Sequence, residues 1–138
     1  MTCAVIDAGI ALSWVLPDET TAQPATEVLS AFRAGEVRLL APSLWEYEVG
    51  NVLRLAVTRG RIGEIDGAEA LRSLLELGVD LAPFAPLAEP AWELSLAHQL
   101  TIYDAAYLAL AQANACPLYS LDRQLIAAAE RIGLTSGR

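Results

Sequence analysis

The sequence contains no lysine and only one histidine, His98, so all nine of its basic residues are arginine. A single histidine argues against catalytic triads and histidine-rich zinc sites, which need such side chains as bases or ligands. The chain also has neither a P-loop nor the G-x-G-x-x-G fingerprint of dinucleotide-binding domains. Chemistry, if the protein performs any, is therefore expected from its acidic side chains.

Long apolar runs are missing as well. No stretch of about 18 uncharged apolar residues occurs, so no membrane span is expected. The first residues, MTCAVIDAG, have no basic residue and reach Asp7 too early for a signal peptide, which makes a cytoplasmic location the default expectation. Cys3 and Cys116 lie far apart and without metal-site spacing, and we interpret both as reduced, buried thiols, with a disulfide as the alternative.

Basic charge is scarce, and the formal net charge is −8. A module that binds nucleic acid through its own surface is usually basic, so a passive nucleic-acid-binding domain is disfavoured. An enzyme that approaches phosphates through bound cations is compatible with this charge. The length of 138 residues and the apolar fraction of 54% suit a single domain over 1–138 with one core.

Strand-like apolar segments alternate with helical segments along the whole chain. The predicted strands are 3–7, 37–42, 79–84 and 116–120, with 134–136 as an optional fifth. The predicted helices are 8–17, 18–34 with Asp18 as its N-cap, 43–60, 65–78, 87–100, 101–114 and 122–133. This alternation predicts an α/β fold, in which helices cover both faces of a central, mainly parallel sheet of four to five strands.

Three aspartates lie near the expected ends of these elements. Asp7 ends the first strand, Asp122 stands two residues past Ser120 at the end of the fourth, and Asp104 opens the helix that leads into the fourth. Ligands of an open parallel sheet bind beyond the carboxyl ends of its strands. Asp7 and Asp122 are thus expected at that edge, whereas the position of Asp104 depends on the course of residues 84–103.

Glu48 is the acid whose position is hardest to explain as ordinary surface charge. It lies in the middle of a predicted helix, on a stripe with Trp45, Val52 and Leu55, and Asn51 lies on or beside the same inward face. A carboxylate on a core face is costly unless a cation neutralises it. Because the chain has no lysine, that cation would be an arginine or a metal ion.

Each acid also has a purely structural explanation. Asp7 and Asp122 could cap the helices that follow them, and Asp104 could complete a capping box with Thr101. Glu48 could pair with a buried arginine, for which the candidates are Arg54 and Arg123. A chance origin for all four acids together is less probable than for any one of them, and Mg²⁺ or Mn²⁺ would relieve their mutual repulsion.

Four segments in this order resemble the PIN domain and, more narrowly, the VapC-type toxin ribonucleases of bacterial toxin–antitoxin pairs: VIDAGIALSWVLPDE, LLAPSLWEYEVGNVL, LTIYDAAYLALA and LYSLDRQLIAAAERIG. The resemblance covers nearly the whole chain and implies the three-layer α/β/α sandwich of that family. Carried over by position, it places the metal-binding and catalytic acids at Asp7, Glu48, Asp104 and Asp122.

The resemblance also implies supporting residues around these acids. The family's Ser or Thr two residues before the last aspartate is Ser120 here, and the asparagine of its E-V-x-N pattern is Asn51. The family's usual Ser two residues after the first aspartate is Gly9 in this chain. That departure removes one hydroxyl group from the expected site.

The implied function is metal-dependent endoribonucleolytic cleavage by the toxin of a type II toxin–antitoxin module. Carboxylates that hold one or two Mg²⁺ or Mn²⁺ ions would activate water for phosphodiester hydrolysis. The implied partners are an RNA substrate, a cognate VapB-type antitoxin that blocks the acidic groove, and a second copy of the chain in a homodimer. Apolar residues at 14–16 are candidates for one of these interfaces.

Two other acidic α/β families fit less well. Receiver domains and haloacid-dehalogenase-type phosphatases both need a lysine, and the latter needs D-x-D where this chain has DAG. The remaining alternative is a catalytically inactive PIN-like domain that serves only as a protein-binding module.

Overall fold

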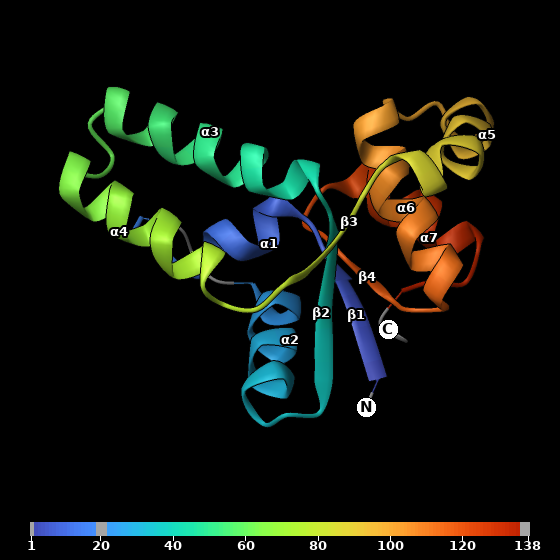
Figure 1. Cartoon of the computed structure of the whole chain (residues 1–138), viewed down its shortest axis with the longest axis horizontal. Helices are drawn as coiled ribbons and strands as arrows, with labels where there is room; N and C mark the ends of the chain where they lie inside the picture. Colours follow the sequence, from blue (N-terminus) through green and yellow to red (C-terminus); the bar gives the residue numbers. More distant parts are fainter. Residues whose placement is uncertain (1, 19–21, 136–138) are drawn as a thin grey trace.

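Four parallel strands form the central sheet of the computed structural model, which describes residues 2–18 and 22–135 (Figure 1). In chain order they are β1 (Thr2–Ile6), β2 (Val37–Pro42), β3 (Asp80–Ala82) and β4 (Leu118–Tyr119). Their spatial order is β3-β2-β1-β4, and Val5 of β1 lies opposite both Leu40 and Leu118. Because every pairing is parallel, the carboxyl ends of all four strands lie along one edge.

Helices cover both sides of this sheet. The helices are α1 (Ala8–Ser13), α2 (Gln23–Arg33), α3 (Leu44–Thr58), α4 (Glu64–Leu75), α5 (Ala88–His98), α6 (Ile102–Asn114) and α7 (Arg123–Arg131), with the short 3-10 helix η1 (Ala85–Leu87) before α5. In Figure 1, α1 and α2 lie on one side of the sheet and α6 and α7 on the other, while α3 and α4 project as an arm. The predicted three-layer α/β architecture is confirmed.

Helix α6 lies at the centre of the core. All seven residues from Ala105 to Ala111 are buried, because α5 covers one side of the helix and the sheet the other. A helix that is apolar on nearly every face is stable only in such an enclosed position. Since α6 leads into β4 through a short connection, its first turn lies at the carboxyl edge of the sheet. The longest helix of the described residues, α3, has 15 residues and is too short to span a membrane.

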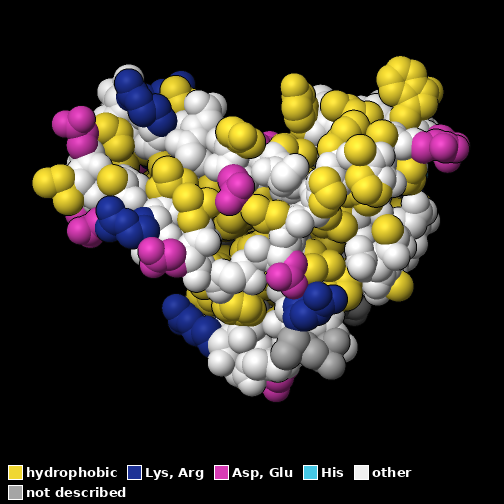
Figure 2. Space-filling model, in the orientation of Figure 1, with side chains coloured by type: hydrophobic (Ala, Val, Ile, Leu, Met, Phe, Trp, Pro, Cys, Tyr) yellow, Lys and Arg dark blue, Asp and Glu magenta, His cyan; other side chains and the backbone are white. Residues whose placement is uncertain are grey.

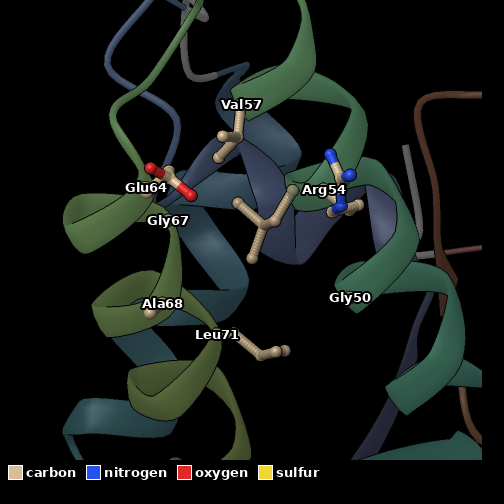
Figure 3. Close-up of a pocket in the computed structure, with 8 residues that line it drawn as sticks. Gly50, Arg54, Val57, Glu64, Gly67, Ala68 and Leu71 are labelled. Carbon is tan, nitrogen blue, oxygen red and sulfur yellow. The ribbon is translucent and has the colours of Figure 1, made fainter.

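Helices α3 and α4 approach each other closely at a glycine. A Cβ atom on Gly67 of α4 would lie 2.8 Å from Cγ2 of Val57 on α3, whereas one on Gly50 of α3 would lie 3.8 Å from Leu71 (Figure 3). A glycine inside a helix costs about 1 kcal/mol relative to alanine. The close contact with Val57 explains why Gly67 occupies this position.

Two predicted helix boundaries were wrong, and so was the optional fifth strand. The first helix ends at Ser13, and the second begins at Gln23, with Pro24 in its first turn; Asp18 does not cap it and instead accepts a hydrogen bond of 2.7 Å from the Arg61 guanidinium. Residues 19–21 lie outside the described part. Of the optional fifth strand, 134–136, the structure describes residues 134–135, which are not in a strand; residue 136 lies outside the described part. The Leu134 carbonyl nevertheless accepts a hydrogen bond of 2.8 Å from the Leu118 amide.

The prediction of reduced thiols was also wrong. Cys3 and Cys116 form a disulfide, with their Cα atoms 5.5 Å apart, within the range that this bond allows. The two residues meet because β1 and β4 are neighbouring parallel strands, a pairing that sequence spacing does not reveal.

Residues 14–16 do not form an exposed apolar surface within this chain. Leu16 is buried, Trp14 and Val15 pack against the core, and the Trp14 indole donates a hydrogen bond to the Ala25 carbonyl at 3.0 Å. Contacts within the chain therefore account for these residues.

Candidate active site

Asp7 lies at the carboxyl end of β1, and its two carboxylate oxygens have different partners. Oδ1 accepts a hydrogen bond of 3.0 Å from the Ile10 amide and so caps α1. Oδ2 accepts a hydrogen bond of 2.5 Å from the Ser120 hydroxyl. Asp7 therefore does cap a helix, as its structural explanation required. Only one of its two oxygens is used for capping, and the other faces the end of β4.

Ser120 connects two of the predicted acids. It is buried directly after β4, where its hydroxyl oxygen accepts a hydrogen bond of 3.0 Å from the Asp122 amide while donating to Asp7. Asp122 in turn caps α7 by accepting from the Leu125 amide at 3.0 Å, and its side chain is exposed. The turn after β4 therefore holds both acids at the same edge of the sheet.

Glu48 is half-buried on α3, and its partner is neither of the two proposed arginines. The Tyr107 hydroxyl on α6 donates a hydrogen bond of 2.5 Å to Glu48 Oε1. Arg54 instead contacts Thr58 on its own helix. Tyr107 is the residue that our sequence analysis missed, although it stands one turn after Asp104 on the same helix, where a shared face could have indicated it.

Asp104 occupies the first turn of α6. The Thr101 hydroxyl accepts a hydrogen bond of 3.1 Å from the Asp104 amide and caps the helix. Among the described residues, no backbone amide donates to the Asp104 carboxylate, so the reciprocal half of a capping box is not formed. The Asp104 carboxylate is therefore available for another role.

The four acids form one electrostatic cluster, which we call the acid cluster: Asp7, Glu48, Asp104 and Asp122. Burial raises the pKa of Asp7, and the charges of Asp104 and Asp122 raise it further, against the lowering effect of the bonds from Ser120 and Ile10. Burial also raises the pKa of Glu48, helped by the charges of Asp104 and Asp7 and opposed by the Tyr107 hydrogen bond. The pKa of Asp104 is raised by burial and then by Asp122. These couplings show that α1, α3, α6 and the turn after β4 bring the predicted acids together.

No arginine neutralises the acid cluster within the described residues. The two ion pairs found there join Arg38 to Asp80 and Arg61 to Asp18, away from the cluster. Three half-buried carboxylates and an exposed one, without cationic partners, suit a hard divalent cation, which prefers oxygen ligands. In residues 2–18 and 22–135, however, no three acidic, histidine or cysteine side chains lie close enough to form a ready-made metal site.

Asn51 and Leu55 do not lie on the inward face where the helical pattern placed them. Asn51 is exposed, and the Leu55 side chain is 40% exposed. The inward face of α3 instead contains Trp45, Val49 and Leu53. Glu48 lies at the border of this stripe, which explains how it can be half-buried and still reach Tyr107.

Gly9 leaves room for the hydroxyl that the resemblance led us to expect. A Cβ atom there would lie 3.5 Å from Asp7 Oδ1, an ordinary van der Waals distance. The missing side chain thus changes what surrounds Asp7 and does not result from crowding.

Two hollows flank this region. One of about 330 Å³ lies between α3 and α4, with Val57, Leu71 and Arg54 among its lining residues, and no member of the acid cluster lines it (Figure 3). The other, of about 310 Å³, is lined by residues of α3 and α6, the end of β2 and the segments after β2 and β3. In the space-filling view, a notch separates the α3–α4 arm from the arm of α5 and α6, where hydrophobic side chains gather (Figure 2).

Comparison with known proteins identifies the family. The PIN domain model matches residues 4–131. Ribonuclease VapC9 of Mycobacterium tuberculosis is 36% identical over 121 residues, which is 88% of this chain and 87% of that protein. Ribonuclease VapC3 of Pyrobaculum aerophilum is 33% identical over 123 residues, with coverages of 88% and 90%.

Solved structures have the same fold. The crystal structure of PAE2754 from Pyrobaculum aerophilum matches with a TM-score of 0.70 at 23% identity, covering 99% of this chain and 88% of that one. VapC20 of Mycobacterium tuberculosis, described as a toxin that cleaves the sarcin–ricin loop, matches with a TM-score of 0.66 at 17% identity, covering 91% and 94%. With the family model and the curated relatives, the conclusion is that the chain belongs to the PIN-domain family and, within it, to the VapC ribonucleases.

Proposed function

We propose that the acid cluster is the catalytic centre of this VapC endoribonuclease, and that its four carboxylates hold one or two divalent cations, Mg²⁺ or Mn²⁺. The observation that supports this most strongly is that hydroxyl groups hold Asp7 and Glu48 in place, while no arginine pairs with any of the four acids within the described residues. VapC ribonucleases of the PIN family generally need a divalent metal. The all-oxygen donor set fits Mg²⁺ and Mn²⁺ better than softer metals.

The residues around the acids prepare them for this role. Ser120 fixes one oxygen of Asp7, and Tyr107 fixes one oxygen of Glu48, so both carboxylates are oriented from outside the cluster. A bound divalent cation would polarise the phosphodiester and lower the pKa of water at the site. Asp7, Glu48 and Asp104 would contact it directly or through water, while exposed Asp122 would complete the site from the turn after β4. Arg123, beside Asp122 and exposed, is a candidate for holding a flanking phosphate.

The proposed partners follow from membership of the family. The substrate is RNA, a VapB-type antitoxin covers the acidic groove and inhibits cleavage, and the toxin acts as a homodimer. Light scattering at micromolar concentration tests the dimer, and a monomeric mass would contradict it.

The experiment that tests the function uses two glutamates of one helix. Glu48 is half-buried in the cluster, whereas Glu46, two residues earlier on α3, is exposed. Purified wild-type protein, Glu48→Gln, Asp104→Asn and Glu46→Gln are incubated with total cellular RNA, with Mg²⁺, Mn²⁺ or chelator, and the new ends are mapped. We expect wild type and Glu46→Gln to leave the same metal-dependent ends carrying 5′ phosphates, and the two cluster variants to lose at least about a hundredfold in rate.

Two outcomes would contradict the proposal. Equal cutting by all four proteins would indicate a contaminating nuclease. No cutting by folded, antitoxin-free wild type with metal bound would favour the alternative, a PIN-like domain that only binds proteins.

A further inference from the structure

An apolar groove of about 310 Å³ lies beside the acid cluster. Its lining is almost entirely apolar and comes from two helices and two connecting segments, including Pro42, Leu44, Phe84, Ile102 and Tyr103. Phe84 is 40% exposed and Tyr103 is 62% exposed, so both aromatic rings are accessible to solvent. Exposed aromatic rings on an apolar groove are typical of a binding surface.

The groove is continuous with the acid cluster through shared helices. Tyr103 directly precedes Asp104 on α6, and Leu44 stands one turn before Glu48 on the same side of α3. The groove therefore lies within one helical turn of Asp104 on α6 and of Glu48 on α3. Whatever occupies the groove is in reach of the substrate whose phosphodiester lies at the acids.

The chemistry of the groove suits a neutral, flat group and not a phosphate. No arginine lines it, and the neighbouring acids repel phosphates. With a net charge of −8 and no lysine, the protein has few cations with which to bind RNA, so neutral contacts must supply part of the affinity. Aromatic side chains supply such contacts by stacking on nucleobases.

We propose that the groove binds one unpaired nucleobase of the RNA substrate, held by stacking on Tyr103 and Phe84, next to the scissile phosphodiester. The inference rests on the proposed ribonuclease function and adds the place where the substrate base is held, the groove lined by Tyr103 and Phe84. Because the lining offers almost no polar groups, the base is selected by its stacking surface. The expected preference at this position is for purines over pyrimidines, without a strict sequence.

The test measures binding separately from cleavage. Short single-stranded oligoribonucleotides that contain the mapped cleavage site carry the fluorescent base 2-aminopurine at successive positions, and they are titrated with protein in the Glu48→Gln background. We expect quenching at one position beside the cut. Tyr103→Ala and Phe84→Ala should each abolish this quenching and weaken binding by about 5- to 100-fold, while Tyr103→Trp restores both. The dissociation constant of Tyr103→Ala divided by that of the protein that retains Tyr103 should stay constant between about 50 and 200 mM salt, because stacking involves no phosphate.

Trp92 provides the matched control. It is 63% exposed on α5, close to the value for Tyr103, but does not line the groove, so Trp92→Ala should leave quenching and affinity unchanged. Thermal unfolding of each variant checks that the fold is retained. Unchanged affinity and quenching in folded Tyr103→Ala would overturn the proposal. Cleavage by the wild type tests the ribonuclease function separately, because only an inactive wild type would contradict that function. If wild type and Tyr103→Ala both cleave with the same base preference, the nucleobase site alone is refuted.

Discussion

Tyr107 on α6 donates a hydrogen bond of 2.5 Å to Oε1 of Glu48 on α3, across 59 residues of sequence. The bond joins the helix that carries Asp104 to the helix that carries Glu48, and its donor, Tyr107, is buried. It also lowers the pKa of a carboxyl group that burial and neighbouring acids raise. A single hydroxyl group therefore contributes both to the geometry and to the charge state of the acid cluster.

Replacing Tyr107 with phenylalanine should separate these contributions. Without the hydroxyl, the pKa of Glu48 rises, so the acidic limb of the pH–rate profile should move to higher pH and the rate near neutrality should fall by about tenfold. Losing a hydrogen bond to a half-buried carboxylate should also cost about 1 kcal/mol of unfolding free energy. Tyr47, on the same helix as Glu48, is 80% exposed, so Tyr47→Phe is the control and should leave the pH–rate profile unchanged. An unshifted acidic limb in Tyr107→Phe would show that this hydrogen bond does not control Glu48.

Ser120 offers a second test, because its hydroxyl lowers the pKa of Asp7 and accepts from the Asp122 amide. In Ser120→Ala the pKa of Asp7 should rise further, and the affinity for Mn²⁺ near pH 6 should fall by about tenfold or more, because protons compete with the metal. Ser120→Thr keeps the hydroxyl and should restore most of the affinity. Isothermal titration at pH 6 and pH 8 measures this, and equal affinities of Ser120→Ala and wild type at both pH values would contradict it.

The raised pKa values also predict how stability depends on pH. Unfolding returns Asp7, Glu48 and Asp104 to ordinary pKa values near 4, so above that pH the folded protein binds more protons than the unfolded chain. Their contribution to stability is therefore greatest at or below about pH 4, decreases as pH rises through the raised values, and remains low above them. Asp104→Asn, which cannot ionise, should raise the melting temperature of metal-free protein at pH 7 and change it less at pH 4.

Metal binding should reverse this pattern at pH 7. A cation that binds only the folded protein raises its melting temperature in proportion to the logarithm of its concentration. Mg²⁺ or Mn²⁺ should stabilise the wild type and have much less effect on Asp104→Asn. A melting temperature of metal-free Asp104→Asn below that of the wild type at pH 7 would show that the acids do not repel one another in the folded protein.

Replacing each of two glycines of the α3–α4 arm with alanine should have opposite effects on stability. Gly67→Ala gains helix propensity but places a methyl group 2.8 Å from Val57, a branched side chain with little freedom to move, so a net loss of about 1 kcal/mol is expected. Gly50→Ala has 3.8 Å of clearance and should be neutral or gain up to about 1 kcal/mol. Urea unfolding measures both values, and a stabilising Gly67→Ala would show that the arm opens easily at this contact.

The disulfide between Cys3 and Cys116 closes a loop of 113 residues. In the chain-entropy description, such a bond stabilises the folded state by up to about 4–5 kcal/mol. Reduction, or Cys116→Ala, should lower the urea midpoint accordingly, while the acid cluster at the opposite edge of the sheet keeps its metal affinity. A midpoint that does not respond to reductant, with free thiols detected by alkylation, would show that the protein in solution keeps both cysteines reduced.

Much of the fold was predictable because the relevant signals are local. Alternating apolar segments and helical periodicity indicated the layered α/β architecture, and helix-stop residues such as Gly60 marked boundaries. The boundary at Asp18 was wrong: the helix begins at Gln23, and the Asp18 carboxylate binds a side chain 43 residues away, Arg61. Capping preferences describe a residue's neighbours in sequence, whereas its strongest partner here lies elsewhere in the fold.

The sequence by itself determined which side chains are available for chemistry: four acids near element ends, no lysine to neutralise them, and an amino-acid order that resembles one family. Only the tertiary structure decided how those side chains meet. Strand order placed β4 beside β1, which joined Ser120 to Asp7 and Cys3 to Cys116. The packing of α6 against α3 gave Glu48 a tyrosine as its partner and left Asn51 exposed. The physical reason is that periodicity indicates which face of an element is apolar, while the contacts of a polar side chain at the border of that face depend on which element packs there.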